Sequence, residues 1–432
     1  MMLKKIIIVI FVFGLTLLIP VPVFAGDGNT VSMEEFNRLK TDYEQLKGEV
    51  KELKQLLGGQ RQVAKEPAVS EDKYVSVEEF EALKEQVEEV RPGLTSFALT
   101  GYGFSSFTDT EGGDSNFTAG LNPIFLWKLS DKVFFEGELE LELEDGGTAV
   151  GLEYADVSYF LNDYMTLGAG KFLSPFGIFR ERLHPKWINK LPNQPLGYAS
   201  GASRLAPEAQ IGAQVRGGIP LIGDSKMGYT LYASNGPTLE TSATKAGQLA
   251  FKNTDDTNSN KAFGGRIGFL PIPELEVGYS WETSRPGARD TAFHGVNALL
   301  QEVDLSYIRD SDLIKGVIDL RSEWIWSKVD SVDYGTTGGA FKNDRWSRYL
   351  QAAYRPSKVN HSILKNLEFV FRFDQIDQPS KAPTSIDRKR YTEGLNYWIN
   401  PSTVAKLAYQ SDAQDEGGTN QHSLMAEMAV GF

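Results

Sequence analysis

Two groups of charged residues carry the chemistry that this sequence offers. In one segment a glutamate stands at every second position, at Glu136, Glu138, Glu140, Glu142 and Glu144. A second segment, 174–209, is rich in basic residues, namely Arg180, Arg182, His184, Lys186, Lys190 and Arg204. Fixed charges of this kind orient polar solutes and sort ions by sign when they face water. The pattern therefore points to selection of solutes.

Catalysis would need other constellations. The sequence has four histidines, His184, His294, His361 and His422. None has a partnering serine or aspartate that the sequence identifies as a catalytic set. Cysteine is absent, which excludes thiolate catalysis, disulfides and cysteine-ligated metals. Asp256, Asn258 and Asn260 have calcium-ligand spacing, but no glycine or closing glutamate follows. We expect no enzyme, no metal and no cofactor.

The glutamate row predicts an extended strand with two unlike faces. Successive side chains of a strand point to opposite sides, so the five carboxylates share one face and Phe135, Leu139 and Leu141 lie on the other. A charge facing lipid at mid-depth costs about 2–4 kcal/mol, so five carboxylates must face water. Other segments repeat the alternation, for example Glu368 to Asp374. Such strands would separate lipid from an aqueous interior.

Sixteen segments after Thr95 are predicted to be strands. They begin near Phe97, Phe117, Val133, Ala149, Met165, Gln210, Lys226, Ala262, Leu275, Leu300, Ile314, Trp346, Leu367, Arg388, Val404 and His422. Connections 130–132, 162–164, 271–274, 310–313 and 400–403 are short, whereas 109–115, 236–261, 284–297 and 412–421 are long and polar. This pattern predicts an all-β transmembrane fold, a 16-stranded antiparallel outer-membrane β-barrel over residues 95–432. A soluble two-sheet sandwich is the alternative, and it does not explain the one-sided loops.

The start of the chain predicts export. Lys4 and Lys5 precede an apolar run, 6–18, and a small-residue site at Ala25, so residues 1–25 are predicted to be a cleaved signal peptide. An uncleaved anchor is the alternative. Removing two lysines and no acids changes the net charge from −13 to −15. An acidic exported protein is not expected to bind nucleic acid.

The last strand, 424–432, ends on Phe432. Leu424, Ala426, Met428, Val430 and Phe432 share one face, and a terminal aromatic ring suits the girdle at a membrane interface. This ending resembles the signal read by the barrel assembly machinery. We expect Phe432 to close the barrel against the strand that begins near Phe97, with its ring at the periplasmic interface.

Residues 26–94 follow a helical period instead. Apolar residues recur at alternating spacings of three and four from Phe36 to Leu57, and a related pattern restarts at Val75. So short a seam is not stable alone. We expect a periplasmic coiled coil that joins three protomers, or alternatively a helical hairpin within one chain.

The connection 174–209 is the third long loop. A loop this long within a compact domain is usually functional or mobile. We expect it to fold into the lumen, narrow the pore and present its basic residues there; the alternative is a surface flap. Further basic residues are expected to face the lumen at scattered positions, Arg216, Arg266, Arg321, Arg372 and Lys406.

Several motifs resemble the phosphate-selective porin O and P family in order and spacing. They are Glu153–Tyr159, Leu167–Phe172, Ser174–Gly177, Ile211–Gln214, Gly228–Leu231, Gly265–Phe269 and Gly394–Tyr397, spread over most of residues 95–432. The resemblance implies a trimeric outer-membrane porin for passive diffusion of small hydrophilic solutes, with a preference for anions such as phosphate. A different function would use the barrel as an anchor, with the coiled coil tethering the membrane to the cell wall.

Overall fold

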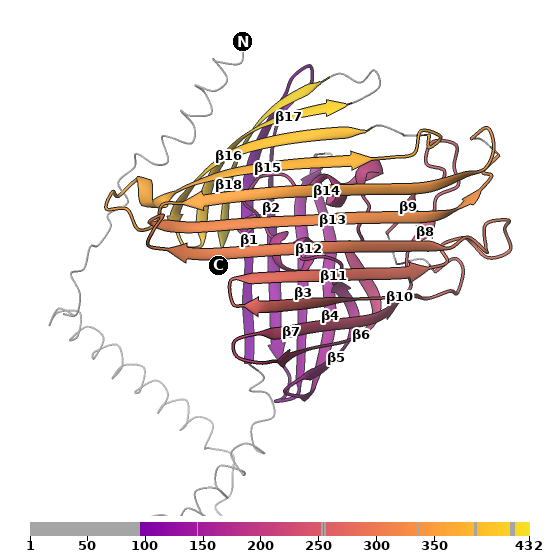
Figure 1. Ribbon diagram of the computed structural model, residues 1–432, viewed down its shortest axis with the longest axis horizontal. Helices are drawn as coiled ribbons and strands as arrows, with labels where there is room; N and C mark the ends of the chain where they lie inside the picture. The colour runs from indigo at the N-terminus through magenta and orange to yellow at the C-terminus, as the bar shows by residue number, and fades with distance from the viewer. Residues whose placement is uncertain are drawn as a thin grey trace, which may run out of the picture. The chain divides into compact units, whose positions relative to one another are not determined.

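The structure, a computed structural model, describes residues 96–144, 146–251, 254, 256–335, 337–383, 387–414 and 420–432. Sixteen of its strands close into one antiparallel barrel, in which β1 pairs with β18 (Figure 1). The predicted barrel is thereby confirmed. The predicted signal peptide (1–25) and coiled coil (26–94) lie outside the described residues. No helix in the part of the chain that the structure describes is long and apolar enough to cross a membrane.

The strand bounds agree closely with the alternation in the sequence. The barrel strands are β1 (Ser96–Thr110), β2 (Ser115–Lys128), β3 (Val133–Glu144), β4 (Gly147–Asn162), β5 (Met165–Leu173), β6 (Ala209–Pro220), β7 (Lys226–Ser234), β10 (Ala262–Ile272), β11 (Leu275–Ser284), β12 (Ala298–Ser311), β13 (Gly316–Val332), β14 (Phe341–Arg355), β15 (Leu367–Asp377), β16 (Arg388–Asn400), β17 (Thr403–Gln414) and β18 (Gln421–Gly431). A hairpin of β8 (Thr238–Leu239) and β9 (Leu249–Ala250) lies between β7 and β10.

Only β14 begins far from its predicted start. It starts at Phe341 and not near Trp346, because an irregularity after Val329 lets Val332 pair with Phe341 and extends the β13–β14 ladder. The sequence did not indicate these first residues of β14, because the outward-facing positions 342 and 344 are charged and the apolar alternation begins only after them.

Local hydrogen bonds explain the short turns. The Ser130 hydroxyl accepts the amides of Lys132 and Val133 at 3.3 and 3.1 Å, and the Asn162 side-chain oxygen accepts the amide of Tyr164 at 2.9 Å. Serine and asparagine favour turns for this reason. Two connections depart from the alternation of short and long: 145–146 is short on the side of the long loops, and 356–366 is long on the side of the turns.

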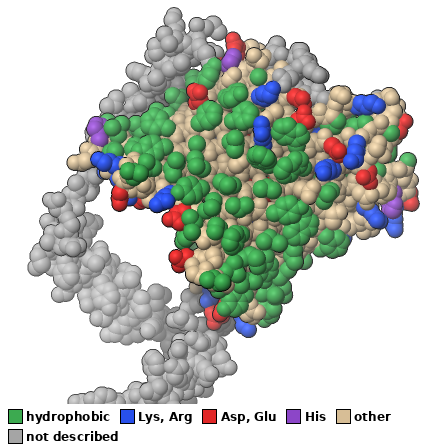
Figure 2. Space-filling model, in the orientation of Figure 1, with side chains coloured by type: hydrophobic (Ala, Val, Ile, Leu, Met, Phe, Trp, Pro, Cys, Tyr) green, Lys and Arg blue, Asp and Glu red, His purple; other side chains and the backbone are tan. Residues whose placement is uncertain are grey.

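The two faces of the barrel differ as the alternation predicts. On β15, Phe369 and Phe371 are 52% and 44% exposed on the outer face, whereas Arg372 and Asp374 are fully buried on the inner face. Figure 2 shows hydrophobic side chains spread over the face formed by β11–β14, with charged groups toward both ends of the strands. An apolar outer band and a polar interior are what a barrel in lipid requires.

The seam of the barrel closes at Phe432. Its amide donates to the Gly101 carbonyl at 3.0 Å, and its carbonyl accepts the Gly101 amide at 3.1 Å. The Phe432 ring is 56% exposed. The predicted pairing of the last strand with the first is therefore confirmed. The role of Phe432 as an assembly signal stays a prediction.

Candidate functional site

The connection between β5 and β6, Ser174–Glu208, folds against the inner faces of strands β11–β18, and we call it the inward loop. It contains a π-helical turn, η1 (Phe179–Leu183), and two 3-10 turns, η2 (Leu196–Tyr198) and η3 (Gly201–Ser203). Most of its partners on the barrel wall lie between Ser280 on β11 and Glu427 on β18. The loop also reaches the opposite side, where Glu181 pairs with Arg216 on β6 and His184 lies 4.0 Å from Glu138 on β3.

An apolar core holds the inward loop to the wall. Phe176, Leu196 and Tyr198 are fully buried, and they form one cluster with residues from the inner faces of β12–β15, namely Leu300, Ile325, Tyr349 and Ile376. Burying a side chain of this size contributes about 1.5–3 kcal/mol. The sequence analysis did not predict this contact. Its signal is the presence of apolar residues, such as Leu300 and Ile325, at inward positions that are otherwise polar.

Strand carboxylates and hydroxyls also hold the loop backbone. The amide of Gly177 donates to the Ser280 hydroxyl at 3.0 Å, and the amide of Ile178 donates to the Glu323 carboxylate at 3.1 Å. The Tyr198 hydroxyl donates to the same carboxylate of Glu323. One inward-facing glutamate on β13 therefore fixes two separate turns of the inward loop.

The basic residues of the inward loop are held in ion pairs. Lys186, Lys190 and Arg182 lie 3.4, 2.5 and 2.7 Å from carboxylates of the wall, which belong to Glu427, Glu368 and Glu276 respectively. Arg180 and Arg204 both pair with Glu208 of the loop, each at 2.6 Å. The loop cations therefore neutralise carboxylates, and most of these carboxylates belong to strands β11–β18, which we call the far wall.

His184 does not add to this positive charge. Its Nδ1 lies 2.5 Å from the Arg180 carbonyl, and its Nε2 lies 4.0 Å from the Glu138 carboxylate. Burial, followed by the nearby charge of Arg180, lowers the pKa of His184 to about 4. The imidazole is therefore neutral at neutral pH, whereas the sequence grouped it with the cations.

The predicted lumenal arginines face inward, but each is paired. Arg216 lies 3.2 Å from Glu181 of the inward loop, and Arg321 donates to Asp319 at 2.7 Å. Arg266 bridges Asp304 and Glu276, at 2.6 and 2.8 Å. Lys406 donates to Glu427 at 2.8 Å and to the Asn189 carbonyl of the loop at 2.7 Å.

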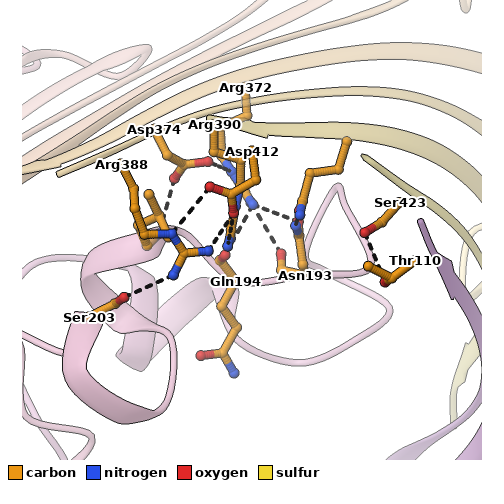
Figure 3. Close-up of polar contacts among 12 residues, drawn as sticks. Thr110, Asn193, Gln194, Ser203, Arg372, Asp374, Arg388, Arg390, Asp412 and Ser423 are labelled. Atoms are coloured by element: carbon orange, nitrogen blue, oxygen red, sulfur yellow. Dashed lines mark hydrogen bonds and ion pairs between the residues drawn. The ribbon is translucent and has the colours of Figure 1, made fainter. Parts of the chain in front are cut away.

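Three arginines on β15 and β16 gather beside the inward loop (Figure 3). Arg372 donates to Asp374 at 2.9 Å, and to the carbonyls of Asn193 and Gln194, both at 3.1 Å. Arg388 and Arg390 share the Asp412 carboxylate. The sequence predicts a strand start at Arg388 but gives no sign of this cluster; the spacing of two residues places Arg388 and Arg390 on the inner face.

The glutamate row lies on the opposite side of the interior, on β3. Glu138 is 1% exposed and accepts hydrogen bonds from the Tyr102 hydroxyl at 2.9 Å and the Asn122 amide at 3.1 Å. Among the described residues, no lysine or arginine forms an ion pair with Glu136, Glu140 or Glu142. The side chain of Glu144 lies outside what the structure describes. The inner face of β3 therefore carries carboxylates that have no lysine or arginine as an ion-pair partner among the described residues.

Two cavities lie along strands β4–β6. The first, about 240 Å³, is bounded by the inward loop and by strands β3–β6, and we call it the side cavity; its charged lining residues are Glu136, Asp156, Glu181, Arg182 and Arg216. The second, about 650 Å³, lies toward the long loops and is lined by residues that include Glu153 and Arg204. A β-bulge leaves Glu153 unpaired between Tyr154 and Leu152, and bulges re-aim side chains in this way.

The fold resembles that of known porins. No protein-family model and no curated protein matches the chain. Among solved structures, OmpF of Salmonella typhi in complex with daunomycin has a TM-score of 0.53 at 13% identity, covering 78% of this chain and 98% of that one. An anion-selective porin from Comamonas acidovorans has a TM-score of 0.51 at 13% identity, covering 78% and 100%. The chain therefore has the closed-barrel fold of outer-membrane porins.

Proposed function

We propose that the protein is an outer-membrane porin, a water-filled channel for the passive diffusion of small hydrophilic solutes and ions. The observation that carries this proposal is the barrel itself, whose outer face is apolar and whose inner face is charged. A barrel of sixteen strands encloses an aqueous channel, because its diameter exceeds what inward side chains fill. The cavities beside the inward loop support a path for water along one wall.

The inward loop is the proposed constriction. It is held to the far wall by an apolar core and by ion pairs such as Lys190–Glu368, and its Glu181 and Arg182 face the side cavity. A loop fixed at this many points can narrow a channel without collapsing. Replacing residues 178–206 with a short glycine-serine linker should raise single-channel conductance if the loop restricts flow.

Conductance in planar bilayers tests the function. Purified full-length protein should insert in large conductance steps, and closure in three equal steps would support the predicted homotrimer. A bilayer that stays silent would overturn the channel and favour the predicted tether, in which residues 26–94 link the outer membrane to the cell wall. Outer-membrane lipid and the barrel assembly machinery are the other proposed partners.

The resemblance to phosphate-selective porins implies a preference for anions, which remains a prediction. The basic residues that would provide it, including Arg372 and Arg390, lie behind or beside the inward loop in ion pairs.

A further inference from the structure

The charges inside the barrel are divided unequally between its two sides. On the wall behind the inward loop, cations of the loop and of the strands pair with carboxylates, as in Lys190–Glu368 and Arg266–Asp304. We call strands β3–β6 the open side. Strands β3 and β4 point carboxylates inward there, and Arg216 is the one basic residue from these strands among the described residues that line the side cavity. Three loop cations, Arg182, Lys186 and Lys190, thus pair with carboxylates of the wall behind the loop.

Glu136 and Asp156 form the centre of this open side. They are direct cross-strand partners in the β3–β4 ladder, and both line the side cavity. Like charges directly opposite each other destabilise a sheet, so this pair is an unfavourable feature that the fold retains. Within the described residues neither side chain has a lysine or arginine as an ion-pair partner.

The cations of the side cavity do not cancel the pair. Arg216 is bound to Glu181 at 3.2 Å, and Arg182 is bound to Glu276 at 2.7 Å. Each of these arginines therefore already balances another carboxylate. The lining as a whole holds three carboxylates, those of Glu136, Asp156 and Glu181, against two arginines, so the cavity keeps a net negative charge.

An independent feature of the same cavity also calls for a positive or hydrogen-donating ligand. Gln214 on β6 lines the side cavity and is 7% exposed, and its side-chain oxygen has no hydrogen-bond partner among the described atoms. A buried acceptor without a partner destabilises the fold, and a ligand that donates to it removes this penalty. A hydrated or partly hydrated cation beside Glu136 and Asp156 would orient a donor toward this oxygen.

We propose that the permeation path runs between the inward loop and the β3–β6 wall, and that Glu136 and Asp156 make it selective for small cations over anions. This inference rests on the proposed channel function and deepens it. It also opposes the anion preference that the family resemblance implies. Because the fixed charges are carboxylates facing water, the preference should weaken as salt screens them.

The reversal potential across a planar bilayer in a potassium chloride gradient tests the inference. The full-length protein should be more permeable to potassium than to chloride, and more so at 0.1 M than at 1 M salt. The double variant Glu136→Gln/Asp156→Asn should lower the potassium-to-chloride permeability ratio by about twofold or more, because it removes two carboxylates that attract potassium and repel chloride.

A matched control removes the same two charges from the outer face of the barrel. Glu393→Gln/Asp344→Asn removes one glutamate and one aspartate from the outer face, where both side chains are exposed, and should leave the ratio unchanged. If the double variant does not assemble, the single variants Glu136→Gln and Asp156→Asn replace it, since each removes one of the two carboxylates that line the side cavity.

The outcomes separate the two proposals. A conducting, anion-selective or unselective wild type would overturn the cation path and leave the channel standing. A ratio that moves equally in the variant and in the outer-face control would also overturn it. A silent bilayer, by contrast, would overturn the channel function on which the inference rests.

Discussion

The Lys190 ammonium of the inward loop lies 2.5 Å from the Glu368 carboxylate of β15, and the two side chains are 15% and 5% exposed. The same carboxylate accepts hydrogen bonds from Asn396 and Trp398, both at 3.1 Å. Buried, multiply bonded pairs of this kind are sensitive to the loss of one partner, because the remaining charge stays buried. The pair is therefore one of the points at which the loop is fixed to the barrel.

Replacing Lys190 should release this part of the loop. Lys190→Met leaves the Glu368 carboxylate buried without its cation and should cost about 3 kcal/mol, whereas the double variant Lys190→Met/Glu368→Gln should cost less. The measurement is the temperature at which the folded, heat-modifiable barrel is lost in detergent.

An exposed pair provides the control for Lys190. Lys342 and Asp344 lie 3.4 Å apart on β14 with side chains 60% and 45% exposed, so Lys342→Met should change stability by less than about 0.5 kcal/mol. Equal losses for the two lysine variants would contradict a specific anchoring role for Lys190.

Gly177 should be needed for the seating of the inward loop. It has φ +71°, and a Cβ there would overlap the Glu323 carboxylate and the Tyr198 hydroxyl. Gly177→Ala should displace the first turn of the loop, raise single-channel conductance or its noise, and open the loop to trypsin. Strain at positive φ adds about 1–2 kcal/mol.

Gly201 separates this steric effect from backbone strain. It has φ +83° in the same loop, but a Cβ there would meet nothing within 4 Å among the described atoms. Gly201→Ala should therefore lower stability only through backbone strain, and it should leave conductance and trypsin resistance as in the wild type. Similar behaviour of the two alanine variants would mean that contact with Glu323 does not position the loop.

The strands could be predicted from the sequence because their signal is local. A strand between lipid and water repeats every two residues, so Phe369 and Phe371 against Arg372 and Asp374 already reveal two faces. Turn residues such as Ser130 act within three positions. Periodicity and turns together gave all sixteen strands.

The arrangement of charges inside the barrel could not be predicted in this way. Lys190 and Glu368 are separated by 178 positions, and nothing near either residue encodes their pairing. Grouping the loop cations by composition therefore suggested a positively charged constriction. In the fold, Arg182, Lys186 and Lys190 pair with carboxylates of the wall, and Arg180 and Arg204 pair with Glu208 of the loop. The glutamate row itself is visible in the sequence, but its lack of lysine or arginine partners can be known only once the other ion pairs are known.

His184 should make stability depend on pH. Its pKa, lowered by burial to about 4 from the usual 6.5, means that the fold favours the neutral ring. The resulting stabilisation is present above about pH 6.5 and is lost as the pH falls toward 4, at up to about 3 kcal/mol. His184→Gln should therefore lose less thermal stability than the wild type between pH 7.5 and 4.5.

An exposed histidine is the control for this titration. His294 lies in the connection between β11 and β12, and its side chain is exposed. His294→Gln should follow the wild-type pH dependence in the same heat-unfolding measurement. If His184→Gln also follows it, carboxylate titration and not the buried imidazole accounts for the acid sensitivity.

The last residue can act through its backbone or through its ring, and two variants distinguish these contributions. Deleting Phe432 removes both hydrogen bonds to Gly101 and the exposed ring, whereas Phe432→Ala keeps the bonds and removes only the ring. Loss of these two backbone bonds leaves the amide and carbonyl of Gly101 without their partners and opens the end of the seam between β1 and β18. We expect both variants to lower the amount of heat-modifiable barrel in outer-membrane fractions, and the deletion to lower it further. A normal level in Phe432→Ala with a reduced level in the deletion would assign the effect to barrel closure alone, and normal levels in both would remove Phe432 from assembly altogether.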